Sequence, residues 1–127
     1  MARFLESVQR DLVVLMGEVA TLHADRARYI RAGHRLVCGA DVARLTREVH
    51  AIEKRGMRDD GWATPGANLS AAALDVARTA CRRAERRVVA LGEKARRLNP
   101  EVVRYLNRLS DLLWLLARWV ETHAAGK

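Results

Sequence analysis

Apolar residues recur at steps of three and four along four stretches of the chain, which is the spacing of one buried face of an α-helix. A first helix is predicted around Phe4, Val8, Leu12, Leu15, Val19 and Leu22. A second is predicted to start near Asp41, a suitable N-cap, and to end before Gly56. Its apolar face consists of Val42, Leu45, Val49 and Ile52.

Two further helices are predicted in the second half of the chain. One begins after Asn68 or Ser70, and its apolar face is Leu74, Ala77, Cys81, Ala84, Val88 and Leu91. The other opens with Asn99-Pro100-Glu101, where an N-cap precedes a proline at the first helical position and an acid in the first turn. Its apolar face is Val102, Leu106, Leu109, Leu113, Leu116 and Val120.

These apolar stripes repeat about every 3.5 residues, the period of helices that pack nearly parallel to one another. The pattern therefore predicts an all-α, up-down bundle of four long helices. Between the first two helices, residues 25–40 have weak periodicity and are either partly helical or a loop. Residues 57–69 are predicted to be non-helical, because Pro65-Gly66 is a turn signal. Trp62 lies in the middle of this loop.

Composition adds that the chain is a single globular domain over residues 1–127, since half of its residues are apolar and 30% are charged. The net charge of +8 comes mostly from arginine. An anionic partner is one interpretation of this charge, because arginine binds phosphates and carboxylates through two parallel hydrogen bonds. A compositional bias towards arginine without any function is the other.

Several classes of function are not expected. The four histidines (His23, His34, His50 and His123) share no metal-binding spacing, and Cys38 and Cys81 are predicted to be reduced, buried thiols. No apolar run is long enough to cross a bilayer and no secretory leader is recognised, so a cytoplasmic protein without a membrane partner is expected. Nucleic-acid binding is not expected either, because the arginines alternate with core and acidic positions.

The chemistry is predicted to lie on the third and fourth helices. Arg78, Arg82 and Glu85 share one helical face and each follows a core position, which places them at the margin of the buried stripe. Asn107, Asp111, Trp114 and Arg118 follow core positions of the fourth helix in the same way. The two polar stripes could frame a pocket between the helices. The alternative is that Arg82, Glu85 and Arg86 form only a solvent-exposed ladder of salt bridges.

Three motifs resemble those of the trimeric, helical-bundle type of ATP:cob(I)alamin adenosyltransferases. The first is an aromatic residue, Trp62, three positions before Pro65-Gly66. The second is the helix Ala77-Arg78-Thr79-Ala80-Cys81-Arg82-Arg83-Ala84-Glu85-Arg86. The third is Tyr105-Leu106-Asn107-Arg108-Leu109-Ser110-Asp111. They occur in the order and at the spacing of that family, and Gln9-Arg10-Asp11-Leu12 resembles its second helix.

The resemblance implies transfer of the 5′-deoxyadenosyl group of ATP to the cobalt of a reduced corrinoid, by a homotrimer of five-helix bundles that binds ATP between subunits. By matching motif, Arg82 would bind the triphosphate, Glu85 the ribose side, and Asn107 a phosphate with help from Mg²⁺. Trp62 would occupy the position of the aromatic residue that crowds the lower face of the corrin. Arg78 would lie at the subunit interface, and no catalytic residue or protein-held metal is assigned.

The chain also departs from that family in ways that leave two functions open. A Thr-Gly-rich phosphate loop and the first helix of the family have no counterpart here, so Arg78 lacks the aspartate expected to pair with it across the subunit boundary. Asp75 stands where the family usually has His, and Ala67 where it usually has Gly. One hypothesis is a corrinoid adenosyltransferase. The other is a non-catalytic relative that binds a corrinoid or a nucleotide, or only assembles with partners.

Overall fold

The computed structural model describes residues 1–55, 66–95 and 98–125 of the chain, and the regular structure in these ranges is helical. In chain order the elements are α1 (Ala2–Ala20), a 3₁₀ turn (His23–Asp25), α2 (Arg26–Arg31), α3 (Gly39–Glu53), α4 (Leu69–Ala95) and α5 (Pro100–Ala125). The predicted all-α class is therefore confirmed. The weakly periodic stretch between the first two long helices divides into the 3₁₀ turn, the short α2 and an irregular segment.

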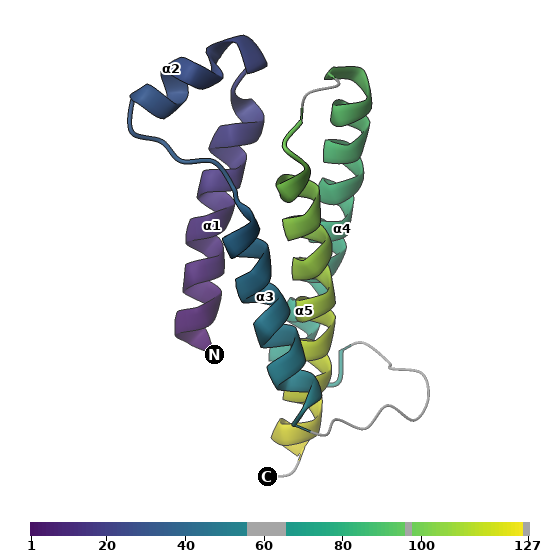
Figure 1. Cartoon of the computed structure of the whole chain (residues 1–127). Coiled ribbons are helices and arrows are strands. Elements are labelled where there is room, and N and C mark those ends of the chain that lie inside the picture. The colour runs from purple at the N-terminus through teal and green to yellow at the C-terminus, as the bar shows by residue number, and fades with distance from the viewer. Residues whose placement is uncertain (56–65, 96–97, 126–127) are drawn as a thin grey trace.

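The four long helices alternate in direction, as the sequence pattern predicts. Figure 1 shows α1 and α4 running one way and α3 and α5 the other, with α2 lying across the end of the bundle that is remote from the C-terminus. Helix α5 packs most extensively against α4 and next against α3. Its central position explains why almost every turn of α5 contributes buried residues.

Side-chain caps define where the later helices begin. Asn68 Oδ1 accepts a hydrogen bond from the Ala71 N–H at 2.8 Å at the start of α4, and Asn99 Oδ1 accepts one from the Glu101 N–H at 3.1 Å before α5. The start predicted for α3 is wrong by three residues. Cys38, not Asp41, is its N-cap, and the Asp41 carboxylate instead accepts a hydrogen bond from the Cys38 N–H at 2.9 Å.

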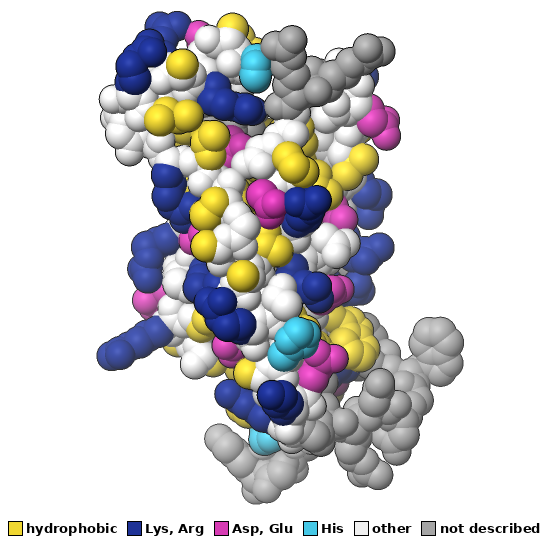
Figure 2. All heavy atoms as spheres, viewed as in Figure 1, with side chains coloured by type: hydrophobic (Ala, Val, Ile, Leu, Met, Phe, Trp, Pro, Cys, Tyr) yellow, Lys and Arg dark blue, Asp and Glu magenta, His cyan; other side chains and the backbone are white. Residues whose placement is uncertain are grey.

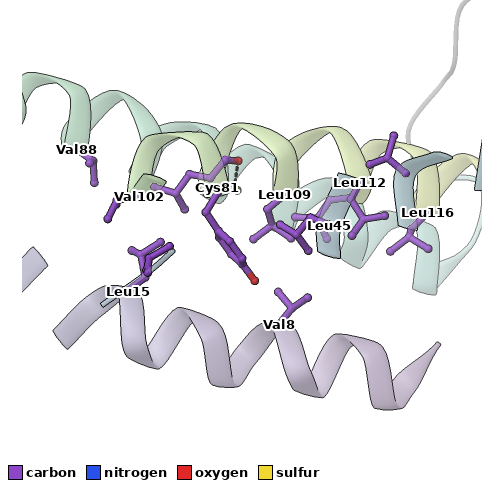
Figure 3. Packing of buried hydrophobic residues seen from close by; sticks show 14 of the residues in the cluster. Val8, Leu15, Leu45, Cys81, Val88, Val102, Leu109, Leu112 and Leu116 are labelled. Carbon is purple, nitrogen blue, oxygen red and sulfur yellow. Dashed lines mark hydrogen bonds between the residues drawn. The ribbon is translucent and has the colours of Figure 1, made fainter. Parts of the chain in front are cut away.

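The core is a continuous band of aliphatic side chains from all four long helices. Figure 3 shows Val8 and Leu15 of α1 pointing towards residues of α4 and α5, with Leu45 of α3 and Leu112 of α5 close together further along the bundle. Leu45, Ile52, Val102 and Leu112 are fully buried. Such interdigitated packing at three-and-four spacing is what the four stripes predict.

Three positions of the predicted stripes are wrong. Leu22 is 71% exposed because α1 ends at Ala20, which places Leu22 in the turn that follows. Leu91 is 42% exposed and Ala77 is also exposed. A straight helix of 3.6 residues per turn drifts away from a stripe of 3.5-residue period, which explains the exposure of Leu91 at the far end of the stripe. Ala77 stays on the face of the stripe and is exposed because that face lines an open groove between α1 and α4.

Polar groups inside the bundle join α1 to the rest of the molecule. The Asp11 carboxylate forms ion pairs with Arg44 of α3 and, at 3.3 Å, with Arg35. It also accepts a hydrogen bond from the Tyr105 hydroxyl of α5 at 2.9 Å. Burial together with this hydrogen bond raises the pKa of Tyr105, so the phenol stays protonated and remains a donor.

Among the described residues, no helix combines the length and the apolar character needed to cross a bilayer.

Candidate functional site

A polar cleft lies between α3, α4 and α5 on the side of the bundle away from α1. Its volume is about 560 Å³. The lining residues are Val49, His50 and Glu53 of α3, Arg78 and Arg82 of α4, and Arg108, Ser110, Asp111, Trp114 and Leu115 of α5. The structure thus brings together, in one cleft, the two stripes of polar residues that the sequence places beside the core.

The cleft contains more positive than negative charge. Among the described lining residues, Arg78, Arg82 and Arg108 face two carboxylates, Glu53 and Asp111, and Asp111 is engaged with Arg108 at 3.5 Å. The Arg78 Nε is buried and has no hydrogen-bond partner among the described residues. A buried guanidinium N–H without a partner is costly, so this arrangement favours an anionic group brought in from outside the chain.

Glu85 and Asn107 lie beside the cleft rather than in its lining. The Asn107 Nδ2 donates a hydrogen bond to Glu85 Oε2 at 3.1 Å, which links α4 to α5 three residues beyond Arg82 along α4. Arg82 and Asn107 are exposed and Glu85 is partly buried. All three can therefore be reached by a ligand that enters the cleft and extends along the groove between the two helices.

The alternative of a salt-bridge ladder on α4 is not what the structure contains. The Glu85 carboxylate is bound by Asn107, and within the described residues Arg82, Arg83, Arg86 and Arg87 have no ion-pair partner. On the face drawn in Figure 2, basic side chains are spread along the molecule with acidic ones between them, so that face has no continuous basic stripe.

Trp114 and the buried ion pairs behind it are a part of the site whose arrangement the sequence does not disclose. The Arg118 guanidinium stacks over the Trp114 ring, with Cζ 5.4 Å from the ring centroid, and forms a 2.6 Å ion pair with Asp75 of α4. Arg118 also pairs with Glu121 at 2.9 Å and is only 8% exposed. Burial acts to lower the pKa of Arg118, but the hydrogen bonds that Arg118 donates to Glu121 and Asp75 outweigh it and raise that pKa.

The sequence places Arg118 on the polar margin of α5, and this placement is wrong because Asp75 draws it into the interface. The one indication of this pairing in the sequence is Asp75, an acid at a position that faces the core of the bundle. A partner 43 residues away cannot be identified from helical spacing alone.

The prediction of two buried thiols is half correct. Cys81 is buried, and its thiol donates a hydrogen bond to the Leu106 carbonyl at 3.2 Å, drawn as a dashed line in Figure 3. Burial raises the pKa of Cys81 to about 11. Cys38 is exposed, because it caps α3 at the surface rather than lying inside a helix. Trp62, the predicted corrinoid contact, lies outside the described residues.

A second, apolar groove runs between α1 and α4, with α5 as its floor, and has a volume of about 570 Å³. Of the described residues that line it, only Gln9 is polar. The rest of the lining is Leu5, Val8, Leu12, Leu15, Met16, Leu74, Ala77, Ala80, Cys81, Ala84, Leu106, Leu109 and Leu113. Ala77, which is exposed, is one of the small alanines of α4 that line this groove. Because its lining is almost entirely apolar, the groove has few groups for polar chemistry.

Comparison with known proteins shows which family this chain is similar to. A family model described as cobalamin adenosyltransferase matches residues 1–120. The corrinoid adenosyltransferase of Bacillus subtilis is 50% identical over 119 residues, which cover 94% of this chain and 61% of that protein. The cobalamin adenosyltransferase of Cupriavidus metallidurans is 36% identical over 119 residues, covering 94% and 59%.

A solved structure gives the same result in three dimensions. It is a variant of the PduO-type ATP:corrinoid adenosyltransferase from Lactobacillus reuteri complexed with cobalamin and ATP. It superposes with a TM-score of 0.84 at 28% sequence identity and covers 97% of this chain and 65% of that one. The chain spans about three fifths of the length of the Bacillus subtilis and Cupriavidus metallidurans relatives.

Proposed function

Because the chain belongs to the cobalamin adenosyltransferase family, we propose that it acts in the transfer of the 5′-deoxyadenosyl group from ATP to a reduced corrinoid. In this reaction the cobalt of the reduced corrinoid attacks C5′ of ATP, a cobalt–carbon bond forms, and the C5′–oxygen bond breaks. The electron pair of the broken bond leaves with triphosphate. The protein must therefore bind a strongly anionic leaving group next to an apolar, water-free surface for the corrinoid.

The observation that supports this proposal most directly is the cluster of three arginines in the polar cleft. Arg82, with Arg108 beside it, provides guanidinium groups that can bind the triphosphate through charge-assisted hydrogen bonds, and Arg78 adds positive charge to the same cleft. These groups would also stabilise the negative charge that develops as the triphosphate leaves. Mg²⁺ would arrive with the nucleotide, and the structure of a related enzyme contains both ATP and cobalamin.

The residues next to the cleft have proposed roles as well. Glu85 would contact the ribose side of the nucleotide and Asn107 a phosphate. The hydrogen bond between them keeps the two side chains together beside the polar cleft. Trp62 would cover the lower face of the corrin ring and keep bases away from the cobalt. Arg78 would complete its hydrogen bonding with a carboxylate of a neighbouring subunit, for which its unpartnered Nε provides the physical reason. We also predict that the protein is located in the cytoplasm.

Calorimetry with MgATP tests the nucleotide site. We expect Arg82→Ala to weaken MgATP binding by about 10- to 150-fold, since a charge-assisted hydrogen bond contributes roughly 1.5–3 kcal/mol. Arg83→Ala is the matched control, because Arg83 is the next residue on α4 but does not line the cleft. If Arg83→Ala weakens binding and Arg82→Ala does not, the assignment of the binding face is wrong.

The same titration separates the two functional hypotheses. If no binding is detected even at millimolar MgATP, adenosyl transfer by this chain is excluded and a non-catalytic relative takes its place. Corrinoid binding is then measured separately, from the quenching of tryptophan fluorescence by cob(II)alamin. Trp62→Ala is expected to remove most of that quenching, and an unaltered titration would exclude Trp62 from the corrinoid site.

A further inference from the structure

We propose that Asp75 and Arg118 are positioning residues that hold the Trp114 indole as a fixed wall of the polar cleft. This inference rests on the proposed function, because it concerns how the same cleft receives its ligand. Trp114 lines the cleft, whereas Asp75 and Arg118 do not. Neither of the two would touch a ligand there, so any effect on binding must act through the indole.

The geometry of the ion pairs restrains the Arg118 guanidinium on two sides. Asp75 Oδ2 accepts a hydrogen bond from Nη2 at 2.6 Å, and Glu121 accepts from Nη2 at 2.9 Å and from Nε at 3.0 Å. Asp75 belongs to α4 and Glu121 to the next turn of α5, so two different elements hold the plane of this group. A planar cation held in this way is a rigid surface for an aromatic ring.

The indole of Trp114 packs on that surface from one turn earlier in α5. The Cζ of Arg118 lies 5.4 Å from the centroid of the ring, within the range of a cation–π contact. Both Asp75 and Arg118 are 8% exposed, so solvent does not screen this set of contacts. One side of the indole is thereby occupied by Arg118, and Trp114 also borders the cleft that contains Arg78 and Arg82.

Asp75 is the residue that makes this arrangement possible. An uncharged residue at this position would leave Arg118 with Glu121 alone, which lies on its own helix three residues ahead and would not tie it to α4. The arrangement therefore depends on the acid at position 75. It also gives a physical reason for burying an ion pair that a well-packed apolar pair could replace without loss of stability.

The test uses the full chain and separates positioning from stability. Arg118→Lys keeps the positive charge and can still pair with Asp75, but it lacks the planar group on which the indole stacks. The double variant Asp75→Asn/Arg118→Met removes both charges of the pair that joins α4 to α5, so neither of these two is left buried without the other. Glu121, whose side chain is 16% exposed, loses its Arg118 partner in this variant. Arg55→Lys is the matched control, because Arg55 stacks over Trp119 at 5.7 Å in the same way and does not line the cleft.

The direct measurement is the time-resolved fluorescence anisotropy of Trp114 in a Trp62→Phe/Trp119→Phe background, where it is the only tryptophan. We expect a rigid indole in this background and in Arg55→Lys. In Arg118→Lys and in the double variant, a fast local motion is expected while the helical circular dichroism is retained. An indole as rigid in both of these variants as in the parent would overturn the proposal.

Binding of MgATP and of cob(II)alamin provides the second measurement, in protein that keeps all three tryptophans. Trp114→Leu identifies the probe that contacts the indole, and Arg118→Lys is expected to weaken binding of that probe by about 3- to 30-fold, the range of a cation–π contact. Unchanged binding in Arg118→Lys, where Trp114→Leu weakens it, also overturns the proposal. If neither probe binds the natural protein but Trp114 gains motion in Arg118→Lys, the proposed function fails and the positioning role of Arg118 stands.

Discussion

At the scale of single residues, burial gives the two cysteines of this chain different chemistry. The Cys81 thiol is enclosed by the core, donates its hydrogen to the Leu106 carbonyl, and has a pKa raised to about 11. Only the thiolate is a nucleophile, and burial disfavours the thiolate. Cys38 is exposed at the start of α3, where nothing shields it from a reagent in solution.

We therefore predict that one thiol, Cys38, reacts with a disulfide reagent in the folded protein at pH 8, and that the second reacts only in denaturant. At that pH a thiol of pKa about 11 is ionised to roughly one part in a thousand, and Cys81 is in addition inaccessible. The measurement is the amount of thiolate that the disulfide reagent releases as a function of time. Cys38→Ser should abolish the fast phase, and a fast phase that survives this substitution would contradict the burial of Cys81.

At the scale of elements, Asn99 joins three parts of the chain at the start of α5. Its Oδ1 caps α5, and its Nδ2 donates to Glu18 Oε2 of α1 at 2.9 Å and to the Val37 carbonyl at 2.7 Å. The other oxygen of Glu18 accepts from the Val37 N–H at 2.7 Å. Glu18 is only 4% exposed, so its carboxylate depends on these donors.

Asn99→Ala is predicted to lower the free energy of unfolding by about 2–4 kcal/mol. About 1 kcal/mol of this is the lost cap, and the remainder comes from buried acceptors that lose their donor. Asn68→Ala is the control, because Asn68 caps α4 with one hydrogen bond of the same kind and is predicted to cost only about 1 kcal/mol. Urea unfolding of both variants measures the difference. Equal losses would mean that Asn99 acts only as a cap.

The contact between α1 and α2 depends on a glycine. A Cβ atom added at Gly17 would lie 2.3 Å from the Tyr29 hydroxyl oxygen. Two non-bonded atoms do not lie so close together, so the Tyr29 side chain or the backbone would have to shift. Tyr29 also stacks on His34, with ring centroids 4.5 Å apart. The absence of a side chain at Gly17 therefore allows the short α2 to lie against α1.

The effect of Gly17→Ala is predicted to change sign with the residue at position 29. In the natural protein it should destabilise, because the hydroxyl of Tyr29 must move. In a Tyr29→Phe background the nearest remaining atom is 3.5 Å away. The helix propensity of alanine should then dominate and stabilise the protein by up to about 1 kcal/mol. A thermodynamic cycle of the four proteins checks this, and the same sign in both backgrounds would exclude the contact.

At the scale of the whole molecule, the described helices leave apolar surface open to solvent. The part of the chain that the structure describes gives the groove between α1 and α4 a single polar lining residue, and Met16 on its edge is 59% exposed. Apolar surface on this scale is typical of a protein that associates with another chain. This favours the homotrimer implied by the family resemblance, with the groove covered by a second copy.

Light scattering at micromolar protein is accordingly predicted to return three times the 14.3 kDa mass of the chain. Ala80→Glu, which introduces a charge into the groove, should shift the distribution towards the monomer because a buried unpaired charge is costly. Ala90→Glu on the same helix, outside the groove lining, is the control and should assemble normally. A monomer mass for the natural protein would exclude self-assembly.

The fold class, the four long helices and most of the core are predictable from local patterns in the sequence. These follow from local regularities, because an apolar stripe of helical period has to face other helices whatever its exact partners are. The N-cap Asn99, and Asn68 as one of two candidates with Ser70, could be predicted for the same reason, since a cap acts within three residues of its own position. The position of Arg78 and Arg82 beside the core was also predictable, because it follows from their angle around the helix relative to the apolar stripe. Both residues line the cleft.

The residues that meet across helices are not predictable in this way and are seen only in the folded molecule. Asp75 with Arg118, Glu85 with Asn107, and Asn99 with Glu18 are separated by 43, 22 and 81 residues, and no periodicity within one helix specifies such pairs. Their formation depends on the rotation and stagger of one helix against another, which a stripe restricts only to within about a residue. The same freedom explains why Arg118 is buried and Ala77 exposed.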